Sequence, residues 1–116
     1  DVALFIQVES ASALEAVDEY AALDGVDVLF VGPTDLSHAL GVPGDIKSDE
    51  YRRAVERVGK AAAANGKAAG VLLWSFHDLF IYRDAGFTVL AVGSDGSTIA
   101  SSARQLVADF HDRFLR

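Results

Sequence analysis

The sequence predicts an α/β fold of four consecutive βα units, and two observations indicate it. Short apolar runs of strand length alternate along the 116 residues with longer amphipathic segments, as in repeated βα units. The chain is also 51% hydrophobic, enough for the core of one domain. Four units fit either a small open sheet or half of an eight-stranded (β/α)8 TIM barrel, because a whole barrel needs about 250 residues. Since Asp1 directly precedes a strand-like run, we expect a half barrel that is part of a longer chain.

The first unit is predicted to have a strand over residues 3–8 and a helix that ends near Leu23. Ser12 and Glu15 have the spacing of a capping box, so the helix is expected to begin at Ser12. The second strand, residues 26–31, is apolar at nearly every position. That pattern predicts that both faces of the strand are covered, as in a parallel sheet flanked by helices.

A loop rich in glycine and proline is expected over residues 32–47, and loops of that length in compact domains are usually functional or disordered. Ser48 is predicted to cap the next helix. Val55 and Val58 lie on its inner face at helical spacing, and Gly66 follows its end.

The last two units repeat the alternation. The third strand is expected over residues 68–73, and Ser75 to Asp78 resembles another capping box before a helix that ends near residue 85. Residues 87–92 are predicted to form the fourth strand, and residues 97–113 the last helix.

Composition excludes several functions. A net charge of −7 disfavours a nucleic-acid partner, because such affinity comes largely from Lys and Arg. The chain has no cysteine, which excludes disulfides and thiolate chemistry and fits a reducing compartment. The apolar runs are far shorter than a bilayer span, and no secretory signal pattern occurs. We expect a cytoplasmic protein without a membrane partner.

Two carboxylates follow the first two predicted strands: Glu9 and Asp35. If these strands are parallel neighbours, both acids lie at the carboxyl edge of one sheet, where α/β folds place their ligands. Two hard oxygen ligands there indicate a divalent metal. The alternatives are that Glu9 caps the first helix and that Asp35 forms an Asx-turn or caps a short turn.

Several motifs together resemble the HpcH/HpaI family of metal-dependent pyruvate aldolases. They are Gln7 to Ser10, Gly25 to Asp27, Val31 to Ser37, Leu40-Gly41, Gly66 to Gly70 and Val92 to Asp95. The resemblance implies a (β/α)8 barrel of which this chain is the carboxyl-terminal half. The amino-terminal half of the barrel would then be absent from these 116 residues.

The resemblance also implies the roles of individual residues. Glu9 and Asp35 would hold Mg²⁺, Mn²⁺ or Co²⁺. Backbone amides around Thr34 and Asp35 would hold the carboxylate of a 2-oxo acid, with Gln7 near its carbonyl and Leu72 on the aldehyde side. The implied substrate-binding residues are Gln7, Gly32, Pro33, Thr34, Asp35 and Leu72. The family's Arg and its His-Asp pair for proton transfer would lie in the other half, so no catalytic residue is expected here.

The expected activity is aldol cleavage or condensation of 4-hydroxy-2-oxo acids, which gives pyruvate and an aldehyde. A Schiff-base mechanism would need a lysine at a strand end, whereas Lys67 opens the third strand at the wrong end and Lys47 and Lys60 lie in a loop and on a helix. Two alternatives remain. One is a lyase similar to those for citryl-CoA or malyl-CoA, and the other is a catalytically inactive half barrel that binds metal or associates with itself.

Other polar and aromatic residues are assigned structural roles. Ser94 and Asp95 follow the fourth strand but fit ordinary turn and cap chemistry. His38 lies in the loop at a position that the family does not use. Trp74 is expected mainly to pack, with a role in aldehyde specificity at the active edge as the alternative. Phe110 and Phe114 lie one turn apart on the last helix, and a helix that faces only solvent does not need two such large apolar side chains. We therefore expect a homo-oligomer contact there.

Overall fold

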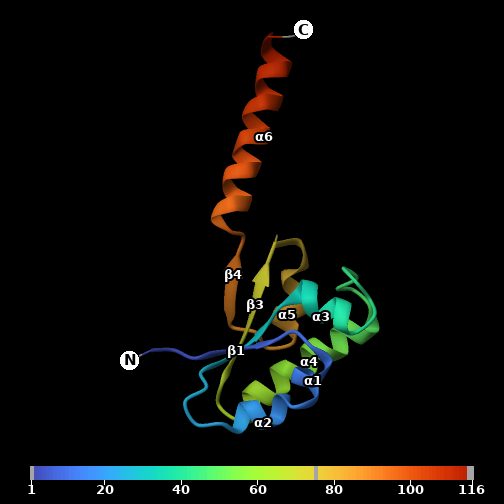
Figure 1. The fold of residues 1–116 in the computed structure, drawn as a ribbon, viewed down its shortest axis with the longest axis vertical. Coiled ribbons are helices and arrows are strands. Elements are labelled where there is room, and N and C mark those ends of the chain that lie inside the picture. Colours follow the sequence, from blue (N-terminus) through green and yellow to red (C-terminus); the bar gives the residue numbers. More distant parts are fainter. Residues whose placement is uncertain (1, 75, 115–116) are drawn as a thin grey trace.

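A computed structural model describes residues 2–74 and 76–114 of the chain. Within that part, four parallel strands form one sheet in the order β1-β2-β3-β4. Their bounds are β1 Phe5–Val8, β2 Val28–Val31, β3 Ala68–Leu73 and β4 Val89–Val92. The predicted α/β fold with four βα units is confirmed (Figure 1).

Helices alternate with these strands. They are α1 Ala11–Glu15, α2 Val17–Ala22, α3 Pro33–Ala39, α4 Asp49–Ala64, the 3-10 helix η1 Phe76–Asp78, α5 Leu79–Asp84 and α6 Asp95–Phe114. Each strand pairs with the next one along the chain. An open doubly wound sheet instead reverses its strand order at a switch point, so the sequential order favours a segment of a barrel.

The core lies between the sheet and the helices on one of its faces. Alternate strand residues point toward α4 and α2 and are fully or nearly fully buried, among them Val8, Leu29, Val31, Val71 and Leu73. They pack with the apolar face of α4, where Val55 and Val58 are buried as predicted.

The opposite face of the sheet is open. Phe5 is 47% exposed there, and its ring centroid lies 5.9 Å from that of Phe30, which is only half-buried. A side chain on Gly70 of β3 would meet Phe30 Cδ2 at 2.7 Å, so glycine makes room for the ring. The expectation that both faces of the second strand are covered is therefore met on the helical face and only in part on the other, where Val28 is buried but Phe30 is half-exposed.

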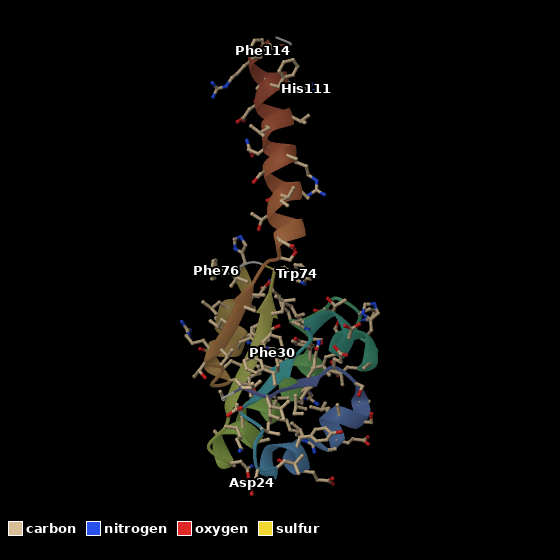
Figure 2. All side chains as sticks on the ribbon, turned by 60° about the vertical axis from the view of Figure 1, so that its left-hand side comes forward. Asp24, Phe30, Trp74, Phe76, His111 and Phe114 are labelled. Atoms are coloured by element: carbon tan, nitrogen blue, oxygen red, sulfur yellow. The ribbon has the colours of Figure 1, made fainter. Side chains whose placement is uncertain are left out.

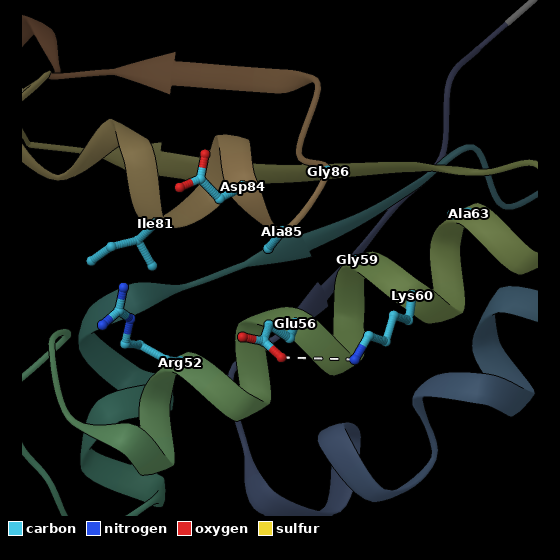
Figure 3. A pocket seen from close by; sticks show the side chains of 9 residues that line it. All are labelled: Arg52, Glu56, Gly59, Lys60, Ala63, Ile81, Asp84, Ala85 and Gly86. Carbon is cyan, nitrogen blue, oxygen red and sulfur yellow. Dashed lines mark ion pairs between the residues drawn. The ribbon is translucent and has the colours of Figure 1, made fainter.

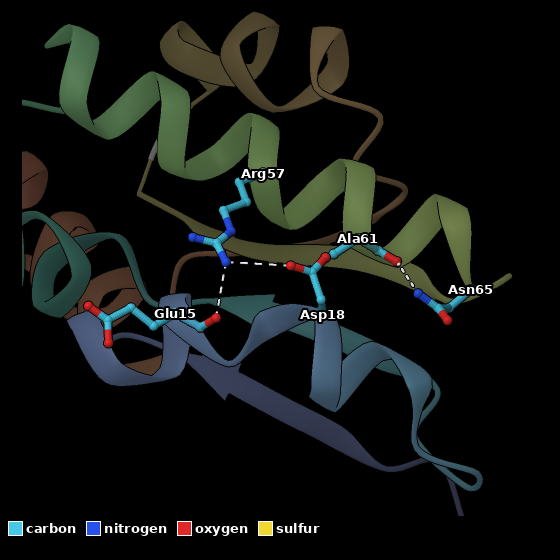
Figure 4. Close-up of polar contacts among 5 residues, drawn as sticks. All are labelled: Glu15, Asp18, Arg57, Ala61 and Asn65. Atoms are coloured by element: carbon cyan, nitrogen blue, oxygen red, sulfur yellow. Dashed lines mark hydrogen bonds and ion pairs between the residues drawn. The ribbon is translucent and has the colours of Figure 1, made fainter.

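Arg57 links the first helical layer to α4 (Figure 4). Its Nη2 donates hydrogen bonds to the Glu15 carbonyl oxygen at 3.0 Å and to Asp18 Oδ2 at 3.4 Å. At the end of α4, Asn65 Nδ2 donates to the Ala61 carbonyl oxygen at 2.9 Å. The Arg57 bonds join α4 to α1 and α2, beside the buried Val17, whereas the Asn65 bond closes the end of α4 itself.

Two local predictions at the first helix and the following loop were wrong. Ser10 caps α1 by accepting a hydrogen bond from Ala13 N at 3.1 Å, so the cap is not Ser12. The helix is also interrupted at Ala16, which ends α1 and precedes α2. Residues 32–47 were expected to form a loop, but they contain α3, because Pro33 occupies a first-turn position where its missing N–H costs nothing.

The remaining boundaries differ less. The cap predicted at Ser75 lies outside the described residues, and Ser48 caps α4 as predicted. The last helix begins at Asp95, two residues early, because Ser94 and Ser97 bond each other's backbone amides through their hydroxyls, at 3.1 and 2.9 Å. Ser94 thus has the structural role expected of it.

Helix α6 extends away from the sheet and the other helices (Figures 1 and 2). No residue of α6 is buried, although it carries several large apolar side chains: Ile99, Leu106, Val107, Phe110 and Phe114. Across the described part of the chain, no helix combines the length and the apolar character that crossing a membrane would require.

Candidate metal and substrate site

Glu9 follows the last residue of β1 at the carboxyl edge of the sheet, where it is partly buried. Gln7 Nε2 donates a hydrogen bond of 2.7 Å to Glu9 Oε2. The cap of α1 is Ser10, so the alternative that Glu9 caps this helix is not observed. The Gln7 amide instead orients the carboxylate at the strand end.

Gly32 allows this carboxylate to lie against the end of β2. Its amide donates to the Val8 carbonyl oxygen at 3.4 Å, which continues the pairing of β1 with β2. A Cβ at position 32 would lie 2.9 Å from Glu9 Oε2 and 3.2 Å from Gln7 Nε2. Any side chain here would therefore displace the Glu9 carboxylate.

Asp35 lies in the first turn of α3 and is exposed. The N-cap position of this helix is Gly32, so Asp35 is not the cap considered as an alternative. Over residues 2–74 and 76–114, its carboxylate has neither a hydrogen-bond partner nor an ion-pair partner. Both carboxylate oxygens of Asp35 are therefore unpaired within the described part of the chain, beside the end of β2.

A pocket of about 130 Å³ lies at this edge. It is lined by Gln7, Phe30, Gly32, Pro33, Thr34, Asp35, Leu72 and Trp74. All six residues that the sequence suggested for substrate binding thus line one pocket, with Glu9 bonded to one of them.

Phe30 is a lining residue that sequence reasoning did not assign, and Trp74 is one for which it favoured packing over a role in aldehyde specificity. Phe30 belongs to an apolar strand, and only the open face of the sheet shows that it reaches the pocket. Trp74 was expected to pack, but it is 63% exposed and lies at the end of β3, as Figure 2 shows. The sequence signal for its place in the pocket was a bulky residue directly after a predicted strand.

The donor set fits a hard divalent cation. Glu9 and Asp35 are carboxylates without a Lys or Arg ion pair in the described residues, so their negative charges are uncompensated there. In the same part of the chain, no three His, Asp or Glu side chains are grouped closely enough to hold a metal by themselves. Two protein oxygens would leave the remaining positions of about six to substrate and water.

The described lining of the pocket contains no His, Lys or Arg. His38 is exposed on α3, and its Nδ1 lies 2.8 Å from the Thr34 carbonyl oxygen. The ring therefore forms a hydrogen bond within its own helix. Lys47 is paired with Asp78 at 3.3 Å. The described lining therefore contains carboxylate oxygens but no side chain of these three types for proton transfer.

A larger pocket of about 440 Å³ lies between α4 and α5, away from the strand ends (Figure 3). Its side chains are of both charges, including Arg52, Lys60, Glu56 and Asp84. Gly59 lies in its wall, and a Cβ there would overlap the Ala85 carbonyl oxygen. At Gly59, α4 and the end of α5 therefore approach each other closely.

Comparison with known proteins shows which family this chain resembles. The family model described as HpcH/HpaI aldolase/citrate lyase matches residues 1–102. A 5-keto-4-deoxy-D-glucarate aldolase of Enterobacter sp. (strain 638) is 37% identical over 110 residues, which are 95% of this chain and 43% of the relative. A hydroxypyruvate/pyruvate aldolase of Deinococcus radiodurans is 40% identical over 113 residues, 97% of this chain and 41% of the relative.

A solved structure agrees with these relatives. The HpcH/HpaI aldolase/citrate lyase family protein from Burkholderia cenocepacia J2315 superposes with a TM-score of 0.84 at 37% identity, over 95% of this chain and 43% of that one. The chain therefore spans less than half the length of these relatives. Its four βα units correspond to that share of a TIM-barrel aldolase.

Proposed function

The chain belongs to the HpcH/HpaI aldolase/citrate lyase family, and on that basis we propose that it carries the metal and 2-oxo-acid site of a class II pyruvate aldolase. The observation that supports this most is the convergence of Gln7, Asp35 and Leu72 on one pocket, with Glu9 held beside it by Gln7. The relatives' activities toward 5-keto-4-deoxy-D-glucarate and hydroxypyruvate or pyruvate agree with a 2-oxo-acid substrate.

Glu9 and Asp35 are the proposed metal ligands, for Mg²⁺, Mn²⁺ or Co²⁺. Gln7 positions Glu9, because its amide bond at 2.7 Å occupies Oε2 and leaves Oε1 without a hydrogen bond among the described residues. A divalent cation bound by these acids supplies Lewis-acid stabilisation of the negative charge that develops on the 2-oxo oxygen of the substrate.

The proposed reaction is cleavage of a 4-hydroxy-2-oxo acid, or its reverse. In cleavage, the C4 hydroxyl loses its proton and the bond between C3 and C4 breaks. The electron pair of that bond passes to C3, which yields an aldehyde and the enolate of pyruvate, and the enolate then takes up a proton at C3. Thr34 and Asp35 would orient the substrate carboxylate through their backbone amides, and Leu72 would face the aldehyde.

The groups that move these protons are proposed to come from outside the 116 residues, from βα units that cover the open face of the sheet. Two features support this. The described part of the pocket has no His, Lys or Arg, and the open face exposes Phe5 and leaves Phe30 only half-buried. An uncovered sheet edge and face of this kind favours association.

We also propose that the protein forms a homo-oligomer through α6. One side of this helix exposes Ile99, Leu106 and Phe110, and the Phe110 and Phe114 rings stack with centroids 5.0 Å apart. These residues recur at helical spacing, as on a buried helix face. Replacing Leu106 and Phe110 with Ser should lower the solution mass of the natural gene product, and an unchanged mass would argue against this contact.

The function is tested by measuring pyruvate release from 4-hydroxy-2-oxo acids by the natural gene product. We expect turnover that a chelator abolishes and that Mn²⁺ or Mg²⁺ restores, because the enolate charge requires the cation. Citryl-CoA and malyl-CoA serve as comparison substrates. Preferential cleavage of a CoA thioester would favour the lyase alternative, and absence of cleavage of any of these compounds would favour a binding module.

A further inference from the structure

The two proposed metal ligands differ in how they are positioned. Gln7 orients the Glu9 carboxylate, whereas the exposed side chain of Asp35 has no hydrogen bond or ion pair within residues 2–74 and 76–114. A carboxylate that no side chain orients has a fixed place only if the backbone that carries it is fixed. The contacts of the first turn of α3 therefore decide where Asp35 lies.

The peptide group that joins Thr34 to Asp35 is held at its carbonyl oxygen by two side chains. Ser37 Oγ donates to the Thr34 carbonyl oxygen at 2.7 Å, and His38 Nδ1 lies 2.8 Å from the same atom. Because a carbonyl oxygen only accepts, the ring nitrogen is the donor in the second bond. The peptide group is planar, so fixing its oxygen also fixes the nitrogen that carries the Asp35 Cα.

Ser37 also links this peptide group to the segment between α3 and α4. Its Oγ accepts a hydrogen bond from Gly44 N at 3.0 Å, and its own carbonyl oxygen accepts from Val42 N at 2.9 Å. Gly44 has a φ of +75°, which favours glycine, so this residue allows the turn that brings its amide to Ser37. One hydroxyl therefore ties the first turn of α3 to a turn further along the chain.

Burial distinguishes the two donors to the Thr34 carbonyl oxygen. Ser37 is fully buried, so water does not replace its bonds, and removing the hydroxyl leaves its partners short of a bond. The neighbouring Leu36 is also fully buried and anchors the backbone next to Asp35 in the core. His38 is exposed, where water competes for the same carbonyl oxygen, so its contribution is the smaller one.

We propose that Ser37 and His38 are positioning residues for Asp35, because they hold the peptide group from which this carboxylate extends. The inference rests on the proposed metal site. Neither Ser37 nor His38 lines the pocket that contains Asp35, so both act on a bound cation only through the backbone. Metal affinity should therefore depend on two groups that do not face the cation.

The test is calorimetric titration of the natural gene product with Mn²⁺ in the absence of substrate, in which the stoichiometry reports the folded fraction separately from the affinity. We expect Ser37→Ala to raise the Kd about 10-fold, at the lower end of the range for groups that orient a metal ligand. Ser37→Thr keeps the hydroxyl, and the adjoining pocket of about 180 Å³ has room for its methyl group. This variant should bind Mn²⁺ like the unmodified protein.

Ser48→Ala is the matched control. Ser48 makes the same pair of contacts at the start of α4, where its Oγ donates to the Asp45 carbonyl oxygen at 2.9 Å and accepts from Tyr51 N at 3.3 Å. Loss of this cap should lower the thermal midpoint and leave Mn²⁺ affinity unchanged. A merely structural role of Ser37 would give the same result in Ser37→Ala.

His38→Ala alters the same carbonyl contact without changing a buried side chain, so it provides the test if Ser37→Ala does not fold. We expect its Kd for Mn²⁺ to rise about 3-fold, as for the loss of one exposed hydrogen bond. Unchanged affinity in His38→Ala would overturn the role of that residue. Unchanged affinity in Ser37→Ala, or equal losses in Ser37→Ala and Ser37→Thr, would overturn the role of Ser37 while the proposed function stands. Normal Mn²⁺ affinity in Asp35→Asn would overturn the metal site and this inference with it.

Discussion

Gln7 Nε2 lies 2.7 Å from Glu9 Oε2 and donates a hydrogen bond to it. The two residues are separated by one position, so their side chains stand on the same face at the end of β1. The bond gives Gln7 a role beyond the substrate contact suggested by sequence, because it fixes the orientation of a proposed metal ligand.

Gln7→Leu removes the donor but keeps a similar volume. We expect the Kd for Mn²⁺ to rise about 10-fold, since hydrogen bonds that orient metal ligands typically contribute this much to affinity. Isothermal titration with Mn²⁺ in the absence of substrate measures it. Unaltered Mn²⁺ affinity would show that Gln7 does not position Glu9.

Gly32→Ala should also weaken Mn²⁺ binding, on the order of 10-fold. A Cβ at this position would lie 2.9 Å from Glu9 Oε2, and the carboxylate must move to relieve that contact. The thermal midpoint should change little, because only the end of a flexible side chain is displaced. A large fall in the midpoint with intact affinity would contradict this account.

Gly59→Ala should lower the stability of the fold and leave Mn²⁺ binding unchanged. Its Cβ would overlap the Ala85 carbonyl oxygen, so α4 and α5 must separate, and we expect a loss of about 2 kcal/mol in unfolding free energy, in the range of overpacking. Urea titration measures the loss. Gly96→Ala, where nothing lies within 4 Å of the new Cβ, is the control and should not destabilise the protein.

The Tyr51 and Tyr82 pair predicts sensitivity to alkaline pH. Burial raises the pKa of Tyr51, and its neighbour Tyr82 adds to the shift; burial also raises the pKa of Tyr82, while its hydrogen bond with Tyr51 partly offsets that. The folded protein therefore keeps both protons above pH 10, where unfolded tyrosines lose theirs. The stability from these groups is complete below about pH 10 and falls above it by up to about 1.4 kcal/mol per pH unit for each tyrosine.

Replacing both tyrosines with phenylalanine removes this dependence without leaving an unpaired hydroxyl. We expect the unfolding free energy of Tyr51→Phe/Tyr82→Phe to vary less between pH 9.5 and 11 than that of the unmodified protein. Urea titrations at several pH values make the comparison. Equal slopes for the two proteins would refute the assignment.

Periodicity in the sequence was sufficient to predict the four strands and the buried face of α4, because these patterns are local. It did not predict α3, where glycine and proline favoured a loop, or the cap at Ser10 in place of Ser12. For the site, spacing placed Glu9 and Asp35 at strand ends, and the resemblance supplied the rest. The position of Trp74 after the third strand placed it at the active edge, whereas the contribution of Phe30 depends on which face of the sheet is open, which no local pattern encodes.

The central claim is that Glu9 and Asp35 bind one divalent cation. Its most direct test is Mn²⁺ titration of the natural gene product, followed by electron paramagnetic resonance or calorimetry, for Glu9→Gln and Asp35→Asn. Glu19→Gln and Asp24→Asn are matched controls, since Glu19 is exposed on α2 and Asp24 lies at the opposite end of the sheet from Trp74 (Figure 2). We predict that each site variant weakens Mn²⁺ binding on the order of 100-fold, because a charged ligand is lost, and that both controls bind normally. Normal Mn²⁺ affinity in either Glu9→Gln or Asp35→Asn would contradict the claim.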